Sequence, residues 1–152
     1  MPISAMSKAI RVLLVEDNRG DARLIQEYLS EAGVAAFSLQ TVDRLSAALT
    51  YLAENAIDAI LLDLGLPDSH GIETLKRVRA QAPTVPVIVV TGFDDREMGV
   101  EALGNGAQDY LVKSRVDSYL LGRAIVRQLE RARAASSQSP AEGQGKPEAD
   151  AG

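Results

Sequence analysis

The chain has 152 residues, of which 46% are hydrophobic and 24% charged, a balance typical of one globular domain. It contains no cysteine, which excludes disulfides and thiolate metal sites, and its net charge of −5 offers no basic surface to nucleic acid or anionic lipid. The apolar run near the start spans only about six residues, too few for a signal peptide or a membrane span. We therefore expect a cytoplasmic protein that binds neither nucleic acid nor membranes.

Five short apolar runs predict β-strands. They are residues 10–15 (IRVLLV), 37–41 (FSLQT), 59–63 (AILLD), 85–91 (VPVIVVT) and 109–112 (DYLV). The first, third and fourth are continuously apolar, as expected of parallel strands that helices cover on both faces.

Stretches with helical spacing follow each run. Three have apolar stripes at Leu24, Ile25, Tyr28 and Leu29, at Leu45, Ala48, Leu49 and Leu52, and at Ile72, Leu75 and Val78. A fourth opens with an Asp-x-x-Glu variant of the capping box at Asp94 and Glu97 and closes near Gly104. A fifth runs from about Asp117 to Ala134, with Leu121, Ile125, Leu129 and Ala132 at helical spacing.

This alternation predicts an α/β fold, a flavodoxin-like doubly wound parallel sheet of five strand–helix repeats with strand order 2-1-3-4-5. We assign residues 9–134 to this domain. Residues 135–152 contain no large apolar side chain, and residues 1–8 belong to no core element. Both ends are therefore expected to be disordered.

Polar residues end four of the five predicted strands. They are Glu16 and Asp17 after the first, Asp63 after the third, Thr91 after the fourth and Lys113 after the fifth. In an open parallel sheet, functional groups collect at the carboxyl ends of the strands. All five side chains should therefore meet at one edge.

Each of these residues also has an ordinary structural explanation. Asp17 or Asn18 could cap the first helix, and Asp63 could be a turn residue before Pro67. Thr91 is common in strands and Lys113 could be a solvated charge. Independent caps and turns, however, have no reason to converge on one edge of a sheet.

Carboxylates gathered in this way repel one another unless a cation neutralises them. Oxygen ligands without His or Cys favour Mg²⁺, with Asp17, Asp63 and a backbone carbonyl of the following loop as ligands and Glu16 holding a bound water. The free oxygen of Asp63 is then a plausible nucleophile toward phosphorus. Mg²⁺, the Lys113 ammonium and the Thr91 hydroxyl would stabilise the charge that develops on the phosphoryl oxygens.

These motifs resemble those of the receiver domain of two-component response regulators. The matching stretches are LLVEDNRGDARLI, ILLDLGLPDSHG, VIVVTG and GAQDYLVK, in the family's order, within a similarity that covers roughly residues 9–133. The resemblance implies an acidic pocket at Glu16 and Asp17, a phosphoacceptor at Asp63, a metal ligand in the Gly65 carbonyl, a switch hydroxyl at Thr91 and a phosphate-contacting lysine at Lys113. Tyr110 matches the aromatic residue that turns inward on activation, although a half-buried strand residue is the ordinary alternative.

The resemblance also implies partners. A sensor histidine kinase or histidine phosphotransfer protein would phosphorylate Asp63. The face made by the helix near residues 96–104, the strand 109–112 and the helix from Asp117 would then contact a downstream protein target, or a second copy of the chain. The protein would catalyse only its own phosphorylation and slow self-dephosphorylation.

Three positions depart from the family pattern. Ser114 follows the lysine where the family usually has proline after a cis peptide bond. Gly65 and Phe93 stand two residues past Asp63 and Thr91, where side chains flank the approach of water to the phosphorus. A missing water-positioning group at Gly65 and a bulky ring at Phe93 both predict a long-lived phosphoryl group.

Two other functions are weaker alternatives. A Mg²⁺-dependent hydrolase of the haloacid dehalogenase kind needs an acid two residues past the nucleophile, where this chain has Gly65. A scaffold that has lost phosphorylation would not be expected to keep every site residue. The tripeptide Arg19-Gly20-Asp21 spells a cell-adhesion motif but opens a helix here, so we assign it no role.

Overall fold

The computed structural model of the chain describes residues 8–92 and 94–145, with side chains up to residue 135. In chain order the elements are β1 (Ile10–Val15), α2 (Arg19–Glu31), β2 (Phe37–Val42), α3 (Leu45–Glu54), β3 (Ala59–Leu62), β4 (Gly65–Leu66), β5 (Ser69–His70), α4 (Ile72–Gln81), β6 (Val87–Thr91), α5 (Arg96–Gly104), β7 (Asp109–Val112), the 3₁₀ helix η1 (Lys113–Arg115) and α6 (Ser118–Gly145). Five of the strands form one parallel sheet in the order β2-β1-β3-β6-β7. The predicted flavodoxin-like topology is therefore confirmed.

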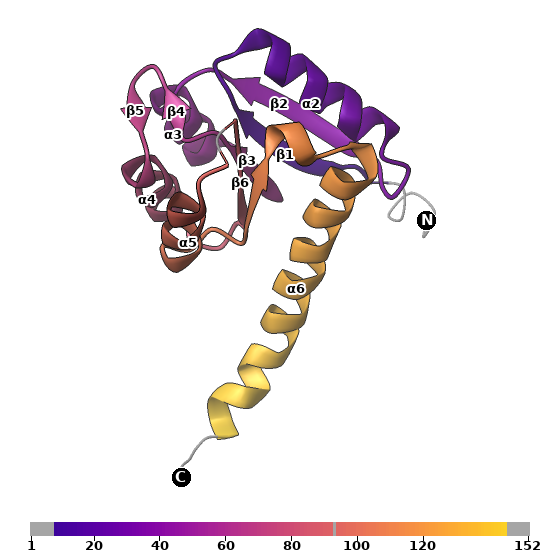
Figure 1. The fold of residues 1–152 in the computed structure, drawn as a ribbon. Coiled ribbons are helices and arrows are strands. Elements are labelled where there is room, and N and C mark those ends of the chain that lie inside the picture. Colours follow the sequence, from indigo (N-terminus) through magenta and orange to yellow (C-terminus); the bar gives the residue numbers. More distant parts are fainter. Residues whose placement is uncertain (1–7, 93, 146–152) are drawn as a thin grey trace.

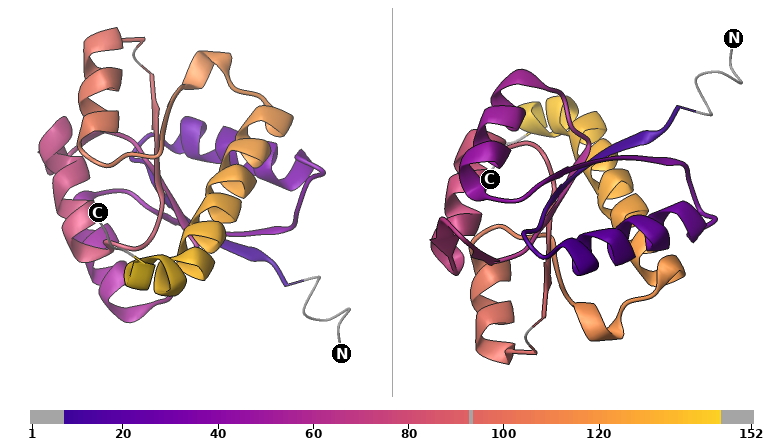
Figure 2. Two further views of the ribbon diagram at one scale, coloured as in Figure 1. Left: turned by 90° about the horizontal axis from the view of Figure 1, so that it is seen from below. Right: turned by 90° about the horizontal axis from the view of Figure 1, so that it is seen from above.

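Helices cover both faces of this sheet, α2 and α6 on one and α3, α4 and α5 on the other (Figures 1 and 2). Alternate strand residues serve the two layers. Leu13 and Val15 of β1 pack in the core cluster beneath α3 to α5, and Val12 and Leu14 pack in the cluster beneath α2 and α6. The same alternation runs along β3 and β6, as side chains that point to opposite faces of a strand require.

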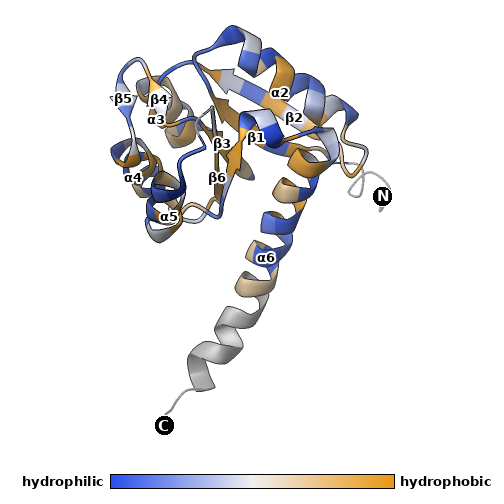
Figure 3. Ribbon diagram, viewed as in Figure 1, coloured by the Kyte–Doolittle hydropathy of each residue, from blue (hydrophilic) through white to orange (hydrophobic). Residues whose placement is uncertain are grey.

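Hydropathy follows this layering, with apolar residues concentrated in the central strands and on the helix surfaces that meet them (Figure 3). Helix α6 begins against the sheet, and its later turns extend away from the domain (Figure 1). Among the residues described, no helix combines the length and the apolar character that crossing a membrane would need.

The last helix is longer than predicted. The backbone of α6 continues to Gly145, whereas the sequence predicts a helix that ends near Ala134. The added turns include Pro140, Gly143 and Gly145, which disfavour helix, so propensity gives no signal for them. The assignment of residues 135–152 to a tail outside the domain stays a prediction. The expected disorder at residues 1–7 and 146–152 lies outside the described residues.

Smaller differences have local causes. Strand β6 starts at Val87, not at residue 85, and follows Pro86, which lacks the N–H that a ladder needs. Asp95, not Asp94, caps α5, since its side chain accepts a hydrogen bond from Met98 N. The two-residue strands β4 and β5 were not predicted, because nothing in so short a stretch shows periodicity.

Candidate functional site

The backbone places two acidic residues side by side at the carboxyl edge of the sheet. Glu16 N donates to Val42 O at 2.9 Å, and Asp63 N donates to Val15 O at 3.0 Å. Hydrogen bonding therefore continues one residue past β1 and past β3. This continuation fixes the backbone positions from which the side chains of Glu16 and Asp63 extend.

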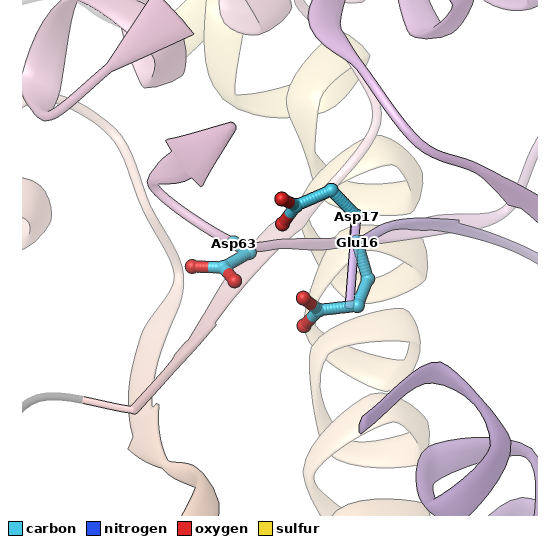
Figure 4. Close-up of side chains that lie close together, drawn as sticks. All are labelled: Glu16, Asp17 and Asp63. Atoms are coloured by element: carbon cyan, nitrogen blue, oxygen red, sulfur yellow. The ribbon is translucent and has the colours of Figure 1, made fainter. Parts of the chain in front are cut away.

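Three carboxylates gather at this edge, as the sequence predicted. Glu16, Asp17 and Asp63 each have an oxygen atom within 4.8 Å of the others, and the close-up shows them converging from the ends of β1 and β3 (Figure 4). Glu16 is only 3% exposed, whereas Asp17 lies open to solvent. The cluster thus has a buried floor and an open side through which a ligand can enter.

Lys113 brings the positive charge to this cluster. Its Nζ lies 2.6 Å from Glu16 Oε1, 2.8 Å from Asp21 Oδ2 and 3.1 Å from Asp63 Oδ2. The contacts to Asp21 and Asp63 are hydrogen bonds, while Glu16 Oε1 makes an ion pair without the angles of a hydrogen bond. The single positive charge of Lys113 therefore contacts three carboxylates and cannot balance their combined negative charge.

The pKa values reflect this crowding. Burial and, to a smaller extent, the charge of Asp63 raise the pKa of Glu16 to about 7, against the opposing effect of the Lys113 ammonium. Burial alone would lower the pKa of Lys113, but its hydrogen bonds to carboxylates and the charge of Asp63 outweigh burial and raise it. The lysine is held in its charged form by the acids around it.

Thr91 and Tyr110 lie toward the other layer of helices. Val89, two residues before Thr91, and Tyr110 both pack with the core cluster beneath α3 to α5, and the two are register partners on β6 and β7. Thr91 is 4% exposed, and a Cβ built on Gly99 of α5 would lie 3.2 Å from the Tyr110 ring. The two predicted switch residues thus share a side of the sheet, and Tyr110 borders α5.

The loop after Asp63 is tied down by the β4–β5 hairpin. Gly65 N donates to Asp63 Oδ1 at 3.2 Å, and Asp68 accepts hydrogen bonds from Leu45 N and Ser46 N at 2.7 and 2.9 Å. Asp68 therefore caps α3, whose own N-cap residue makes no side-chain hydrogen bond. The hairpin links the turn beside Asp63 to a neighbouring helix.

Sequence reasoning missed Asp21 and Asp68. Asp21 belongs to the tripeptide Arg19-Gly20-Asp21, and the sequence signals only its place one helical turn after Asn18. Asp68 contacts residues 23 and 22 positions away, so no local pattern indicates the cap.

Two of the positions that depart from the family pattern can be compared with the structure. The Lys113–Ser114 bond is trans, since the described residues contain no cis peptide bond. Phe93 lies outside the described residues, so its predicted influence on the site stays a prediction.

The donor set fits a hard divalent cation. Three carboxylates converge, one lysine leaves their charge unbalanced, and the buried Glu16 Oε1 accepts no hydrogen bond. A cation, or the water that it holds, could satisfy such an oxygen. The Gly65 carbonyl as a further ligand stays a prediction.

A family model, the response regulator receiver domain, matches residues 12–125 of the chain. The chain belongs to this family. It is 34% identical over 110 residues to the alginate biosynthesis transcriptional regulatory protein AlgB of Pseudomonas putida, an alignment that covers 72% of this chain but 24% of AlgB. The chain thus spans less than a quarter of that relative's length.

Solved structures agree with this assignment. The BeF3-activated DrrB receiver domain is 25% identical with a TM-score of 0.68, covering 82% of this chain and 100% of that one. The phosphorylated cyanobacterial phytochrome response regulator RcpA is 25% identical with a TM-score of 0.63, covering 86% and 94%. Both similar proteins are described in activated or phosphorylated forms.

Proposed function

We propose that this receiver domain takes a phosphoryl group onto Asp63, in a Mg²⁺-dependent reaction, from a sensor histidine kinase or a histidine phosphotransfer protein. The observation that carries the proposal is the position of Asp63 Oδ2, 3.1 Å from Lys113 Nζ and beside Glu16 and Asp17. An apolar residue at the end of this buried strand would pack better than Asp63, so the carboxylate is best explained by a chemical role.

In the proposed reaction, an oxygen of Asp63 forms a bond to phosphorus while the P–N bond of the donor phosphohistidine breaks. The nitrogen keeps the electron pair, and the product is an aspartyl phosphate. Lys113 donates an N–H toward the oxygens that gain charge, and the Thr91 hydroxyl, at the neighbouring strand end, approaches the group from the other helix layer. Beyond this reaction and slow loss of its own phosphoryl group, the protein would not act as an enzyme.

Glu16, Asp17, Asp63 and the Gly65 carbonyl would hold the cation. When bound, Mg²⁺ supplies positive charge to the phosphoryl oxygens and lessens the repulsion between donor and site. The burial of Glu16 suits it to orient a bound water, while the exposed Asp17 can contact the ion directly. No side chain at Gly65 could protonate a leaving group, which disfavours the hydrolase alternative.

The signal would leave through the face formed by α5, β7 and α6. Tyr110 borders α5 at Gly99, and Thr91 ends the neighbouring strand β6, so a movement of Tyr110 would reach α5 directly. Four exposed large apolar side chains lie on the two helices, namely Val100, Leu103, Tyr119 and Leu120. Such residues suit contact with a downstream protein target, or with a second copy of the chain in a homodimer. A cytoplasmic location fits a kinase partner.

Gly65 and Phe93 would set the lifetime of the phosphoryl group. A Cβ at Gly65 would meet nothing within 4 Å, so the glycine leaves open space beside Asp63 and no group to orient water. Both departures favour a long-lived signal, ended by a phosphatase or by transfer to a relay partner. Phe93→Ala is expected to shorten the lifetime.

Intact-mass measurement with acetyl phosphate tests the proposal. One phosphoryl group should be added to the wild type with Mg²⁺, and none to Asp63→Asn or in the presence of EDTA. Asp58→Asn, at the opposite edge of the sheet, is the matched control and should be modified like the wild type. Modification of Asp63→Asn to the wild-type extent, or of a Ser, a Thr or His70 in its place, would refute the assignment.

A further inference from the structure

Lys113 has a partner outside the strand ends. Its Nζ donates a hydrogen bond to Asp21 Oδ2 at 2.8 Å, shorter than the 3.1 Å bond to Asp63 Oδ2. Asp21 belongs to the first turn of α2, and 92 positions separate it from Lys113 in the sequence. Lys113 starts η1 directly after β7, and Leu111, two residues before it, packs in the cluster beneath α2 and α6.

Local hydrogen bonding leaves Asp21 free for this contact. Asn18 is the N-cap of α2, and its side chain accepts from Asp21 N. In a capping box the side chain at the position of Asp21 would reach back to the N-cap N–H. Here Glu16 Oε2 accepts that N–H at 3.1 Å, so the Asp21 carboxylate can turn to Lys113.

The ammonium must divide its three N–H groups among these acids. The Glu16 side chain is 1% exposed, so its ion pair with Lys113 is shielded from bulk solvent. The Asp21 side chain is 41% exposed and can exchange Lys113 for water. A phosphoryl group on Asp63 would bring further charged oxygens within reach of Lys113. Of the present contacts of Lys113, the hydrogen bond to Asp21 is the one that can break to make room for them.

We propose that Asp21 is a positioning residue that holds Lys113 toward α2 in the unphosphorylated protein and competes with the phosphoryl group for the ammonium. The inference rests on the proposed function, in which that group forms on Asp63. Release of Asp21 on phosphorylation would also loosen the tie between α2 and η1, the element that starts at Lys113.

Binding of beryllofluoride, a mimic of the phosphoryl group, tests this in a double-mutant cycle. The half-saturating concentration is measured by ¹⁹F NMR with Mg²⁺ for the wild type, Asp21→Asn, Lys113→Met and the double variant. We expect Asp21→Asn to bind about two- to fivefold more tightly, the range that a partly exposed ion pair allows. In the Lys113→Met background the same substitution should have a clearly smaller effect, because no ammonium is left to release.

Two further variants separate positioning from general charge. Glu27→Gln removes a carboxylate from the same helix, where it pairs with Arg23 at 3.9 Å, and should bind like the wild type. Asp21→Glu should restore most of the competition. If Lys113→Met does not fold, Lys113→Gln replaces it in the cycle.

Equal effects of Asp21→Asn in both backgrounds, or weaker binding by Asp21→Asn, would overturn the inference. Either result could occur while the wild type still binds beryllofluoride and Asp63→Asn does not, which would leave the proposed function intact. Failure of the wild type to bind, or unchanged binding by Asp63→Asn, would instead remove the proposed function.

Discussion

At the amino-terminal edge of the sheet, Arg11 and Asp58 form a pair whose charges cancel, whereas at the carboxyl-terminal edge Lys113 faces three carboxylates. Asp58 accepts hydrogen bonds from Arg11 N, Nε and Nη2 at 2.8, 3.2 and 3.1 Å. Both edges are built by the same strands. The difference lies in whether the charges are matched.

This contrast separates a structural pair from a binding site. Arg11 and Asp58 satisfy each other, so the pair needs nothing further and can only add stability. The carboxyl edge keeps an excess of negative charge and a buried oxygen without a hydrogen bond, which a cation or a reaction must resolve. Function is expected at the edge where the charges are unequal.

The largest expected effect is stabilisation by Mg²⁺. A cation that binds only the folded protein at about 100 times its Kd adds roughly 2.7 kcal/mol to the free energy of unfolding. Urea unfolding with MgCl₂, against NaCl of equal ionic strength, measures it. Asp58→Asn should keep the effect, and Asp17→Asn combined with Asp63→Asn should lose it. A Mg²⁺ effect that survives in the double variant would place the ion elsewhere.

Gly65→Asn is expected to shorten the life of the phosphoryl group about five- to tenfold. An amide beside Asp63 can orient the attacking water through one hydrogen bond, worth roughly 1–1.4 kcal/mol of barrier. Decay of the phosphorylated mass after removal of acetyl phosphate gives the rate. Gly104→Asn, also in open space but at the end of α5, is the control. Equal decay of Gly65→Asn and wild type would place the control of lifetime elsewhere.

Neutralising one residue at each edge should change stability in opposite directions. Without Mg²⁺, Asp63→Asn relieves repulsion among the clustered acids and should raise the free energy of unfolding by about 1 kcal/mol. Asp58→Asn breaks a matched pair and should lower it. Chemical unfolding in EDTA compares the two. A loss of stability in Asp63→Asn as large as that in Asp58→Asn would show that the two edges are alike.

The smallest expected effect is the pH dependence of the Arg11–Asp58 pair. Burial would raise the pKa of Asp58, but the hydrogen bonds and charge of Arg11 outweigh it and hold the pKa below its usual range. Because the pKa of Asp58 is lower in the folded protein, the pair adds to the free energy of unfolding at pH values above the unfolded-state pKa, near 3.8. This contribution is lost as the pH falls through the folded-state pKa. Because the pair is partly exposed, we expect the free energies of unfolding of wild type and Asp58→Asn to differ by about 0.5 kcal/mol at pH 7.

Unfolding curves from pH 7 to pH 2.5 test this pair. The difference between wild type and Asp58→Asn should shrink below about pH 4, where the unfolded carboxyl takes up its proton. A difference that grows on acidification would mean that the pair raises the pKa of Asp58.

The topology and the predicted site followed from features that a sequence displays directly. Continuously apolar runs identified the buried strands, and parallel strands necessarily bring residues such as Glu16, Asp63 and Lys113 to one edge. The contact between Asp21 and Lys113 depends on how α2 is rotated against the sheet, which helical periodicity does not resolve to one side chain. The Asp68 cap depends on two segments that meet only in the folded chain. The added length of α6 has no sequence signal, because its last turns include Pro140, Gly143 and Gly145.

Chemical mapping of the phosphoryl group tests the central claim most directly. Borohydride reduces an acyl phosphate on an aspartate to homoserine, which peptide mass spectrometry locates in the chain. After reaction with acetyl phosphate and Mg²⁺, we predict homoserine at position 63 and none at Asp58. Homoserine at Asp17 or Asp21 in place of Asp63, or a phosphorylated protein with no reducible aspartate, would contradict the account.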